Sequence, residues 1–439
     1  MALLSDPERI PIPASPQRTG NADSGLKYIT TGDYVNSGLP LGLYRLGFGK
    51  VDHDPLGREG LNGTVRYDFN VVQAPNGRDI AVPNCLQCHA QVFEGQLVIG
   101  LGNTFGDFTR PKVGAKTLTA ALDAYLSLDK RNREAAEQFT TVGKAVGDQI
   151  FTETLGANPA DRLTAALIAH RDRNTLQWND SATVKLPETV IPSDVPAWWM
   201  LKKKNAMFYN GFGRGDFGRF LMGAVLLTIN DTLHANKVDA HMPDVLAYLN
   251  QLEAPKYTKP IDKKLAGEGQ VVYETHCGKC HGFYGDYASF PNYLIPQSVI
   301  GTDSLLNKNN YQYSDMIGWF NNSWFAKGDH PARLEPFNGY VAPPLEGVWI
   351  TAPYLHNGSV PTMEALMDSH LRPTYWSRDP DKKLYDYDRL GWTYQVEKGP
   401  CNKTVYNTTL PGYGNGGHTY GDKLEPRERK AVIEYLKTL

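Results

Sequence analysis

The sequence lacks any long hydrophobic run. Its longest apolar stretch covers residues 221–229, whereas a transmembrane helix needs roughly 18 consecutive apolar residues. The first twenty residues contain two arginines and four prolines but no apolar segment, which excludes the pattern of a signal peptide. If the protein is exported, we expect its leader to have been removed before this numbering begins.

The sequence also has little net charge. It carries 45 Lys and Arg against 47 Asp and Glu, a formal charge of −2. This balance gives no indication of a nucleic-acid or membrane-surface partner. Hydrophobic residues make up 41% of the 439 positions and aromatic residues 11%, which excludes collagen-like and coiled-coil architectures. The length predicts about two to three domains.

Cysteine is scarce, but four of the five cysteines lie in two copies of one pattern. Cys85-Leu86-Gln87-Cys88-His89 and Cys277-Gly278-Lys279-Cys280-His281 are both C-x-x-C-H. Two thiols at this spacing can each add to a vinyl group of one haem, and the adjacent histidine can ligate the iron. The sequence therefore predicts two covalently bound haem c groups, with His89 and His281 as iron ligands. Because covalent haem attachment normally follows export, we expect a periplasmic or secreted protein.

Two other kinds of site use paired C-x-x-C motifs. Structural zinc sites usually have their two pairs about 12–20 residues apart, whereas Cys88 and Cys277 lie in different halves of the chain. A thioredoxin-like redox pair belongs in a βαβ context and does not need the histidine. Both explanations are therefore weaker than haem attachment. Cys401 is left over, and we expect it to be a small buried residue or, alternatively, a free thiol.

Each motif is followed, at a similar distance, by the pattern of an amphipathic helix. Residues 242–252 and residues 432–439 show the same spacing of apolar side chains, and Tyr248 in the first corresponds to Tyr435 in the second. A closing helix of this kind after each motif is typical of a repeated domain. The repetition supports two haem-binding domains independently of the cysteines.

A segment rich in Pro and Lys, residues 253–260, cannot continue the first of these helices. It predicts a boundary between an N-terminal haem domain, residues 1–255, and a C-terminal haem domain, residues 256–439. Residues 263–276 are predicted to form a helix that leads directly into Cys277, which resembles the start of a class I cytochrome c domain.

The first motif is preceded by a different pattern. Asn76-Gly77 lies between two strand-like runs, residues 65–72 and 78–82, and this predicts a β-hairpin before Cys85. Helices are predicted over residues 116–129, 132–149 and 158–171. We therefore expect a mainly α fold, with two class I cytochrome c-like domains, long irregular loops and this small β-hairpin element before the first haem motif.

The sixth ligand of each iron decides the chemistry of its haem. A strong-field His or Met makes an electron-transfer site, whereas an open position permits reaction with O₂ or H₂O₂. No histidine occurs between residues 90 and 169, so we expect the first haem to be open. Met222, in an apolar run, is an alternative ligand or a core residue.

The second haem has several candidate distal ligands, which are His330, His356, His370 and His418. His418 ends the glycine-rich segment of residues 412–418, and such a segment lets the backbone approach a haem face closely. His370 follows a short helical run and is the main alternative to His418. A six-coordinate second haem would store and relay electrons.

Residues 343–362 read Pro-Pro-Leu-Glu-Gly-Val-Trp-Ile-Thr-Ala-Pro-Tyr-Leu-His-Asn-Gly-Ser-Val-Pro-Thr. This segment resembles the signature of bacterial di-haem cytochrome c peroxidases and MauG-type enzymes, and its Leu-His-Asn-Gly-Ser-Val-Pro form is most similar to the RoxA-like rubber oxygenase branch. That branch also tends to carry a Gly-His loop before a terminal Tyr-Leu-Lys-Thr-Leu, which residues 417–418 and 435–439 match. The resemblance covers both haem motifs and nearly the whole second domain.

The resemblance implies specific ligands. In the RoxA-like branch His418 would be the distal ligand of the second haem, whereas the peroxidase branch points to His370. Peroxidases also hold a calcium ion between the haems, which by resemblance would bind the carbonyls of Thr351 and Pro353, with Asn103 as a further contributor. Oxygen ligands of this kind suit calcium.

Oxygenases of the RoxA type line the open haem with aromatic residues, and this resemblance implies catalytic roles for Trp198, Trp199, Phe208 and Phe212. A tryptophan between the haems could also relay electrons. Local similarity of residues 208–211 to residues 355–358 would place the aromatic stretch near the haem. The alternative is an aromatic core segment.

These observations predict an exported di-haem c-type cytochrome oxidoreductase that is similar to peroxidases or oxygenases. Its first haem would react with O₂ or H₂O₂, and its second would take electrons from a redox partner protein or a small donor. The alternative is a di-haem electron-transfer cytochrome without catalytic activity. Neither a nucleic-acid partner nor a transmembrane segment is expected.

Overall fold

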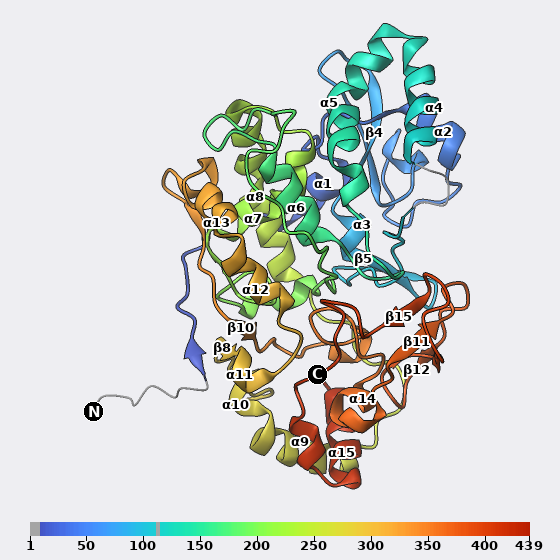
Figure 1. Ribbon diagram of the computed structural model, residues 1–439. Helices are drawn as coiled ribbons and strands as arrows, with labels where there is room; N and C mark the ends of the chain where they lie inside the picture. The colour runs from blue at the N-terminus through green and yellow to red at the C-terminus, as the bar shows by residue number, and fades with distance from the viewer. Residues whose placement is uncertain (1–8, 111–114) are drawn as a thin grey trace.

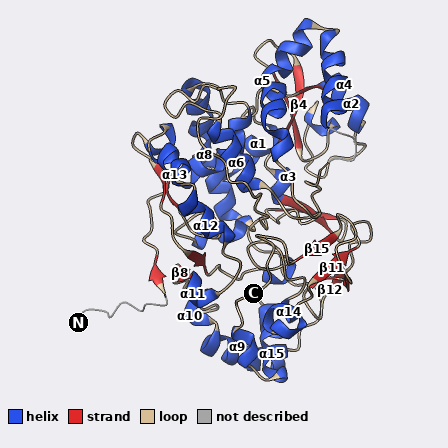
Figure 2. Ribbon diagram, viewed as in Figure 1, coloured by secondary structure: helices blue, strands red, loops and turns tan. Residues whose placement is uncertain are grey.

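The computed structural model describes residues 9–110 and 115–439 and combines helices with several small sheets (Figures 1 and 2). The first eight residues, part of the segment searched for a signal-peptide pattern, lie outside these ranges. Helices gather in the upper part of Figure 1 and again at its lower end, where α9 (Lys263–His276) and α15 (Pro426–Leu436) lie side by side.

The helix before the second motif, α9, has the predicted bounds. By contrast, α8 (Thr232–Gln251) begins well before the predicted residue 242, and Pro243 lies inside it. The other helices before residue 255 are α1 (Ala22–Thr31), α2 (Leu41–Phe48), α3 (Leu86–His89), α4 (Ala115–Ser127), α5 (Lys130–Val146), α6 (Ala160–Ala169) and α7 (Phe217–Leu221). Those after it are α10 (Gly278–His281), α11 (Gln297–Ile300), α12 (Leu305–Gln312), α13 (Ser314–Asn321) and α14 (Met363–Met367).

Two helix pairs make the same kind of close contact. α1 packs against α8, and α9 packs against α15. A Cβ atom on Gly25 of α1 would lie 2.0 Å from the carbonyl oxygen of Asp244, and one on Gly269 of α9 would lie 1.9 Å from that of Ala431. Only glycine permits backbones to approach this closely. The chain therefore repeats one helix crossing, whose first copy the sequence did not reveal.

The prediction of a mainly α fold with two class I cytochrome c-like domains was wrong. The described chain is 39% helical and 14% strand, and its strands form several small sheets. They are β1 (Ile10–Pro11), β8 (Tyr293–Pro296) and β10 (Gly339–Val341); β2 (Leu39–Pro40), β4 (Asp79–Pro83) and β3 (Phe69–Gln73); β5 (Ala90–Phe93) and β6 (Gln96–Ile99); β7 (Gly213–Gly215) and β9 (Ala332–Leu334); β11 (Tyr375–Arg378), β14 (Tyr394–Val396) and β15 (Val405–Asn407); and β12 (Tyr385–Asp386) and β13 (Gly391–Trp392).

Most of the strands were not predicted from the sequence, because they are very short. The backbone of a long buried loop must pair its N–H and C=O groups, and it does so here through strands too short to show a period of two in the sequence. The hairpin predicted before the first motif is confirmed, because β3 and β4 pair antiparallel with Phe69 opposite Pro83. Gly77 takes a positive φ of 77° in its turn.

Both large hydrophobic cores take residues from each side of residue 255. The first core joins residues of α1, α6 and α8 to Trp319, Phe320 and Phe325. The second joins residues of α9, α14 and α15 to Phe93 and Trp199. The two halves of the chain are therefore packed through one another. The boundary near residue 255 stays a prediction about chain organisation.

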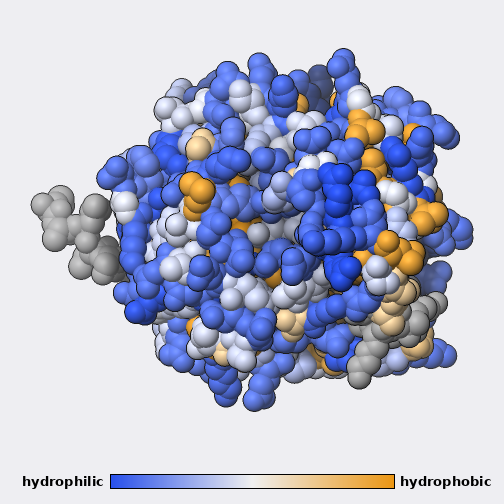
Figure 3. Space-filling view, turned by 90° about the horizontal axis from the view of Figure 1, so that it is seen from above, coloured by the Kyte–Doolittle hydropathy of each residue, from blue (hydrophilic) through white to orange (hydrophobic). Residues whose placement is uncertain are grey.

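The face shown in Figure 3 is mostly hydrophilic, and its hydrophobic residues form small separate groups. Within residues 9–110 and 115–439, no helix has both the length and the apolar character that crossing a membrane requires.

Candidate haem sites

The second C-x-x-C-H motif follows α9 without a break. Cys277 caps α9, and His281 is the last residue of α10. The His281 Nδ1 atom lies 2.8 Å from the carbonyl oxygen of Pro343. A hydrogen bond at Nδ1 fixes the tautomer and leaves Nε2 as the metal-binding atom. Burial lowers the pKa of His281, which keeps the imidazole neutral as iron ligation requires.

His418 lies opposite His281. The centroids of the two imidazole rings are 6.1 Å apart, with 63° between the ring planes. Two imidazoles that share one iron need about 6 Å between centroids, since each contributes a metal–nitrogen bond of about 2 Å and about half a ring. Nδ1 of His418 is buried and has no hydrogen-bond partner among the residues that the structure describes. Burial, with smaller effects of His281 and Arg372, lowers the pKa of His418 to about 3.

The backbone of the glycine-rich loop turns His418 toward His281. His418 has a positive φ of 46°, and its backbone N–H donates to the Ile300 carbonyl over 2.8 Å. The preceding Gly417 has a φ of 70°, and a Cβ there would lie 2.2 Å from the carbonyl carbon of Gly301. Glycine at this position allows the loop to cross the backbone after α11. The glycine-rich loop thus approaches another backbone segment closely, as the glycines in its sequence allow.

Arg372 holds this loop in place. Its guanidinium donates to the carbonyls of Asn415 (2.8 Å), Gly417 (2.7 Å) and His418 (3.1 Å). It also donates to two carbonyls of α14, at 3.0 and 3.1 Å. Five donors in a fixed plane suit arginine alone. The role of Arg372 could not be recognised from the sequence, because an arginine in a loop carries no pattern of its own.

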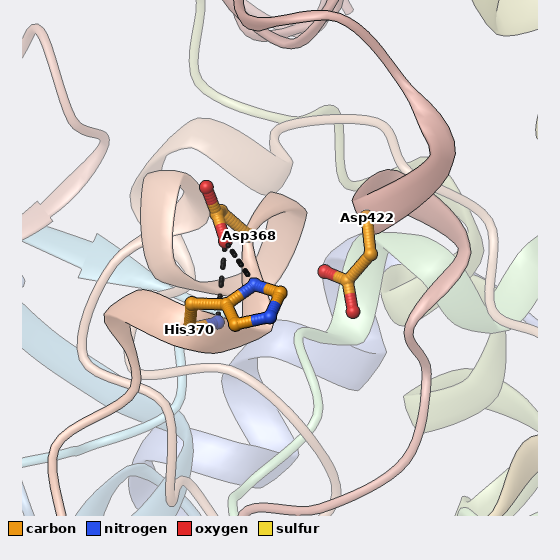
Figure 4. Close-up of side chains that lie close together, drawn as sticks. All are labelled: Asp368, His370 and Asp422. Atoms are coloured by element: carbon orange, nitrogen blue, oxygen red, sulfur yellow. Dashed lines mark hydrogen bonds and ion pairs between the residues drawn. The ribbon is translucent and has the colours of Figure 1, made fainter.

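His370, the alternative distal ligand, lies on the surface. Its side chain is 84% exposed and lies 3.1 Å from Asp368. Figure 4 shows Asp368, His370 and Asp422 together, and their potential ligand atoms lie within 4.8 Å of one another. Asp368 also pairs with Arg429 at 3.1 Å, and Asp422 accepts hydrogen bonds from Ser369. These contacts give both carboxylates of the cluster an ion-pair or hydrogen-bond partner. The geometry favours His418 as the residue opposite His281.

The first motif follows the β3–β4 hairpin. The Asn84 side chain accepts a hydrogen bond from Leu86 N–H (2.8 Å) and so starts the turn of α3 that carries His89. The ring of His89 stacks on Trp198, with centroids 4.6 Å apart and 19° between planes. Burial lowers the pKa of His89 to about 4, opposed by the carbonyl of Pro196. Nδ1 is buried and makes no hydrogen bond of standard geometry.

The four predicted aromatic residues have different surroundings. Trp198 stacks on His89, whereas the indole N–H of Trp199 donates to the Glu346 carbonyl over 2.8 Å and its ring belongs to the second core. Phe208 packs on Phe212, with 5.0 Å between ring centroids. Trp198 is therefore the aromatic residue in direct contact with a motif histidine. The catalytic roles of all four stay predictions.

The remaining iron-ligand candidates have other neighbours. Met222 is fully buried in the first core, which also contains Leu86 and Trp198. His356 is buried, and burial lowers its pKa to about 3. Its Nε2 lies 3.0 Å from the Tyr340 hydroxyl. His330 is exposed.

The residues proposed for calcium make contacts within their own segments. The Asn103 amide donates to the Gln87 carbonyl over 3.1 Å, and its backbone N–H donates to the Cys88 carbonyl over 2.8 Å. The Thr351 hydroxyl donates to the Val348 carbonyl over 3.2 Å. Asn103 therefore supports the first motif, and the calcium site of Asn103, Thr351 and Pro353 stays a prediction. Separately, Cys401 is exposed, so its expected burial was wrong.

Two copies of one turn meet between the motifs. Phe208 and Leu355 have φ values of 69° and 68°, and each turn closes through an isolated bridge, Met207 with Gly213 and Tyr354 with Val360. The similarity of residues 208–211 to residues 355–358 is thus a shared backbone conformation. Their second residues, Tyr209 and His356, face each other with ring centroids 6.5 Å apart.

Comparison with known proteins agrees with these features. Residues 339–377 match the family described as RoxA-like, cytochrome c-like. This segment contains the turn that carries His356 and the residue Arg372. The match supports haem c binding and a haem-based oxidoreductase or electron-transfer role. The matched segment also contains Pro343, whose carbonyl meets His281.

Two curated relatives come from Sinorhizobium fredii (strain NBRC 101917 / NGR234). The chain is 30% identical over 240 residues to the uncharacterized protein y4iJ, covering 41% of this chain and 39% of that protein. It is 24% identical over 306 residues to the uncharacterized protein y4iM, covering 61% of this chain and 69% of that protein. The chain thus spans well under half the length of the first relative.

Proposed function

We propose that the protein is an exported di-haem c-type cytochrome oxidoreductase. Cys85 and Cys88 hold the first haem with His89 as its ligand, and residues 277–281 hold the second in the same way. His418 is the distal ligand of the second haem. The chain then has two haem-bearing parts, residues 1–255 and 256–439, which are packed through one another.

The observation that carries this proposal is the spacing of the His281 and His418 rings. Their centroids lie 6.1 Å apart, and burial holds both imidazoles neutral. A buried neutral imidazole with an unpaired ring nitrogen is costly, because that polar atom has been removed from water. A shared iron would satisfy both rings, and the C-x-x-C-H motif supplies the means to attach it.

A haem with two strong ligands exchanges electrons, and one with an open position also binds O₂ or H₂O₂. The residues around the two proposed haem sites differ. Pro343 orients His281, and Arg372 holds the loop of His418. On the first side, Trp198 stacks on His89 and excludes water from that face of the ring. We infer that the first haem is the reactive one and the second relays electrons.

Haem counting and ligand binding test this function. The protein would be produced with a cytochrome c maturation system, and the pyridine haemochrome assay should give two covalent haems per chain. Cyanide should shift the absorption of one haem only. The double variant Cys85→Ser with Cys88→Ser should retain one haem, whereas Cys401→Ser, an exposed control, should retain two. A native protein with fewer than two haems would contradict the proposal.

An electron-transfer cytochrome without catalysis is the second candidate. It is favoured by the burial of Met222 in the same core as Leu86 and Trp198, because a Met ligand would close the first haem. In that case neither haem should respond to cyanide, and Met222→Ala should make one of them responsive. A first haem that binds cyanide in the native protein excludes this alternative.

A further inference from the structure

A hydrogen-bonded pair lies where the two turns meet. The Tyr209 hydroxyl donates to Asp194 Oδ2 over 2.6 Å. The Asp194 backbone N–H donates to the His356 carbonyl over 2.8 Å, and the Val341 N–H donates to the Tyr209 carbonyl over 2.7 Å. These reciprocal bonds tie each turn to the segment that precedes the other. Tyr209 and Asp194 are therefore held in fixed positions relative to both halves of the chain.

The pair connects to both haem motifs through short paths. On the first side, the Asn158 amide donates to Cys88 Sγ over 3.3 Å, and its backbone pairs with Ser193, the residue before Asp194. On the second side, Tyr340 stacks on His356 with centroids 4.3 Å apart. The strand of Tyr340 leads into Pro343, whose carbonyl meets His281. The pair is thus linked to both motifs by a short series of contacts.

Tyr209 differs from its tyrosine neighbours in what accepts its proton. The Tyr406 hydroxyl donates to the Asn357 carbonyl over 2.7 Å, and the Tyr340 hydroxyl donates to the Asp303 carbonyl over 2.6 Å. The Tyr340 hydroxyl also lies 3.0 Å from Nε2 of His356, but burial lowers the pKa of that imidazole to about 3, which makes it a much weaker base than a carboxylate with a raised pKa. A backbone carbonyl cannot take up a proton at ordinary pH, whereas a carboxylate can. Loss of one electron makes a phenol O–H strongly acidic, so a tyrosine can be oxidised easily only where such a base is in contact.

Asp194 is suited to receive that proton. Burial raises its pKa to about 7, against the opposing effects of the Tyr209 hydrogen bond and the charge of Arg378. A carboxylate with a raised pKa is a stronger base than an exposed one, which favours transfer along the 2.6 Å hydrogen bond. The carboxylate and the phenol are already in contact, so the transfer needs no movement of heavy atoms.

We propose that Tyr209 and Asp194 form a proton-coupled redox pair through which electrons pass between the two haems; this rests on the proposed function. Hydrogen peroxide is the oxidant, and Tyr209 loses one electron to a haem site that peroxide has oxidised above the ferric state. The Tyr209 O–H bond breaks, and its proton moves to Asp194 Oδ2, which leaves a neutral tyrosyl radical. One electron from the other haem, together with the proton returned by Asp194, restores tyrosine.

The tyrosyl radical on Tyr209 can be detected directly by electron paramagnetic resonance. The protein with both haems oxidised would be mixed with hydrogen peroxide, frozen within milliseconds and examined by electron paramagnetic resonance. The native protein should give a tyrosyl signal that narrows when the chain is labelled with ring-deuterated tyrosine. Tyr209→Phe should abolish this signal. Asp194→Asn, which keeps a hydrogen-bond acceptor but is no base, should lower its yield at least about tenfold, and Asp194→Glu should restore it.

Tyr406→Phe is the matched control, because it removes a buried tyrosine whose proton has no carboxylate acceptor; its signal should equal that of the native protein. Haem count and absorption spectra before peroxide should be the same in all variants and show that each is folded. A signal that persists in Tyr209→Phe overturns the inference while leaving the proposed function intact. If peroxide changes neither haem spectrum of the native protein, the proposed function fails and the inference fails with it.

Discussion

The imidazole rings of His281 and His418 lie 6.1 Å apart, although one follows α9 and the other belongs to the loop before α15. The packing of α9 on α15 brings these two segments together. Opposed neutral imidazoles at this separation fit one iron between them. The same helix contact that closes the fold therefore also brings together the two imidazoles that we propose as ligands of the second haem.

Removing His418 should change the spin state of one haem. In His418→Ala the second iron loses a strong-field ligand, so its absorption and electron paramagnetic resonance signals should become high-spin. His370→Ala is the control, because that side chain is 84% exposed and pairs with Asp368. A low-spin second haem in His418→Ala that turns high-spin in His370→Ala would reverse the assignment of the distal ligand.

Arg372 should control how firmly His418 is held. Arg372→Lys keeps the charge but loses the planar fork that reaches five carbonyls. We expect a loss of about 1–3 kcal/mol in unfolding free energy and easier displacement of His418 by added cyanide. Arg429→Gln, which removes a partly buried ion pair with Asp368, should leave cyanide binding unchanged. Equal cyanide titrations of the two variants would show that Arg372 does not position the ligand.

Substitution of two glycines of α9 by alanine should change the unfolding free energy in opposite directions. Gly269→Ala places a Cβ 1.9 Å from the Ala431 carbonyl oxygen, so the α9–α15 contact must open at a cost of about 1–3 kcal/mol. No heavy atom lies within 4 Å of a Cβ built on Gly267, so Gly267→Ala should stabilise the helix by up to about 1 kcal/mol. Denaturant unfolding measures both. Similar effects of the two changes would contradict the crossing described for this helix pair.

Asp194 should make stability depend on pH. Its folded pKa is raised to about 7, whereas an unfolded aspartate has a pKa of about 3.9. Between these values the folded state binds more protons, so unfolding free energy should fall as pH rises from about 4 to about 7 and then level off. Asp194→Asn should lack this fall and gain up to a few kcal/mol over the native protein at pH 8. Parallel pH profiles of the two proteins would count against the raised pKa.

Several features of the candidate sites could be predicted because they are local in the chain. The two C-x-x-C-H motifs each lie within five residues, and the helix of residues 263–276 and the hairpin at Asn76-Gly77 show their own periodicity and turn residues. The similarity of residues 208–211 to 355–358 was also visible, since a shared turn needs the same glycine at the same place. The choice of His418 came from a resemblance, and the ring geometry now favours it.

Other features could not be predicted, because they depend on contacts between distant segments. The small sheets form where loops from different parts of the chain pair their backbones, as Ile10 does with Leu294. The helix crossing at Gly25 and the five hydrogen bonds of Arg372 leave no local pattern for the same reason. The amino-acid sequence by itself determined the two C-x-x-C-H motifs that we propose as haem-attachment sites, since that chemistry needs only neighbouring side chains. Only the tertiary structure decided which residues face His281 and His89 and how Tyr209 meets Asp194, because those distances arise from packing segments far apart in the chain.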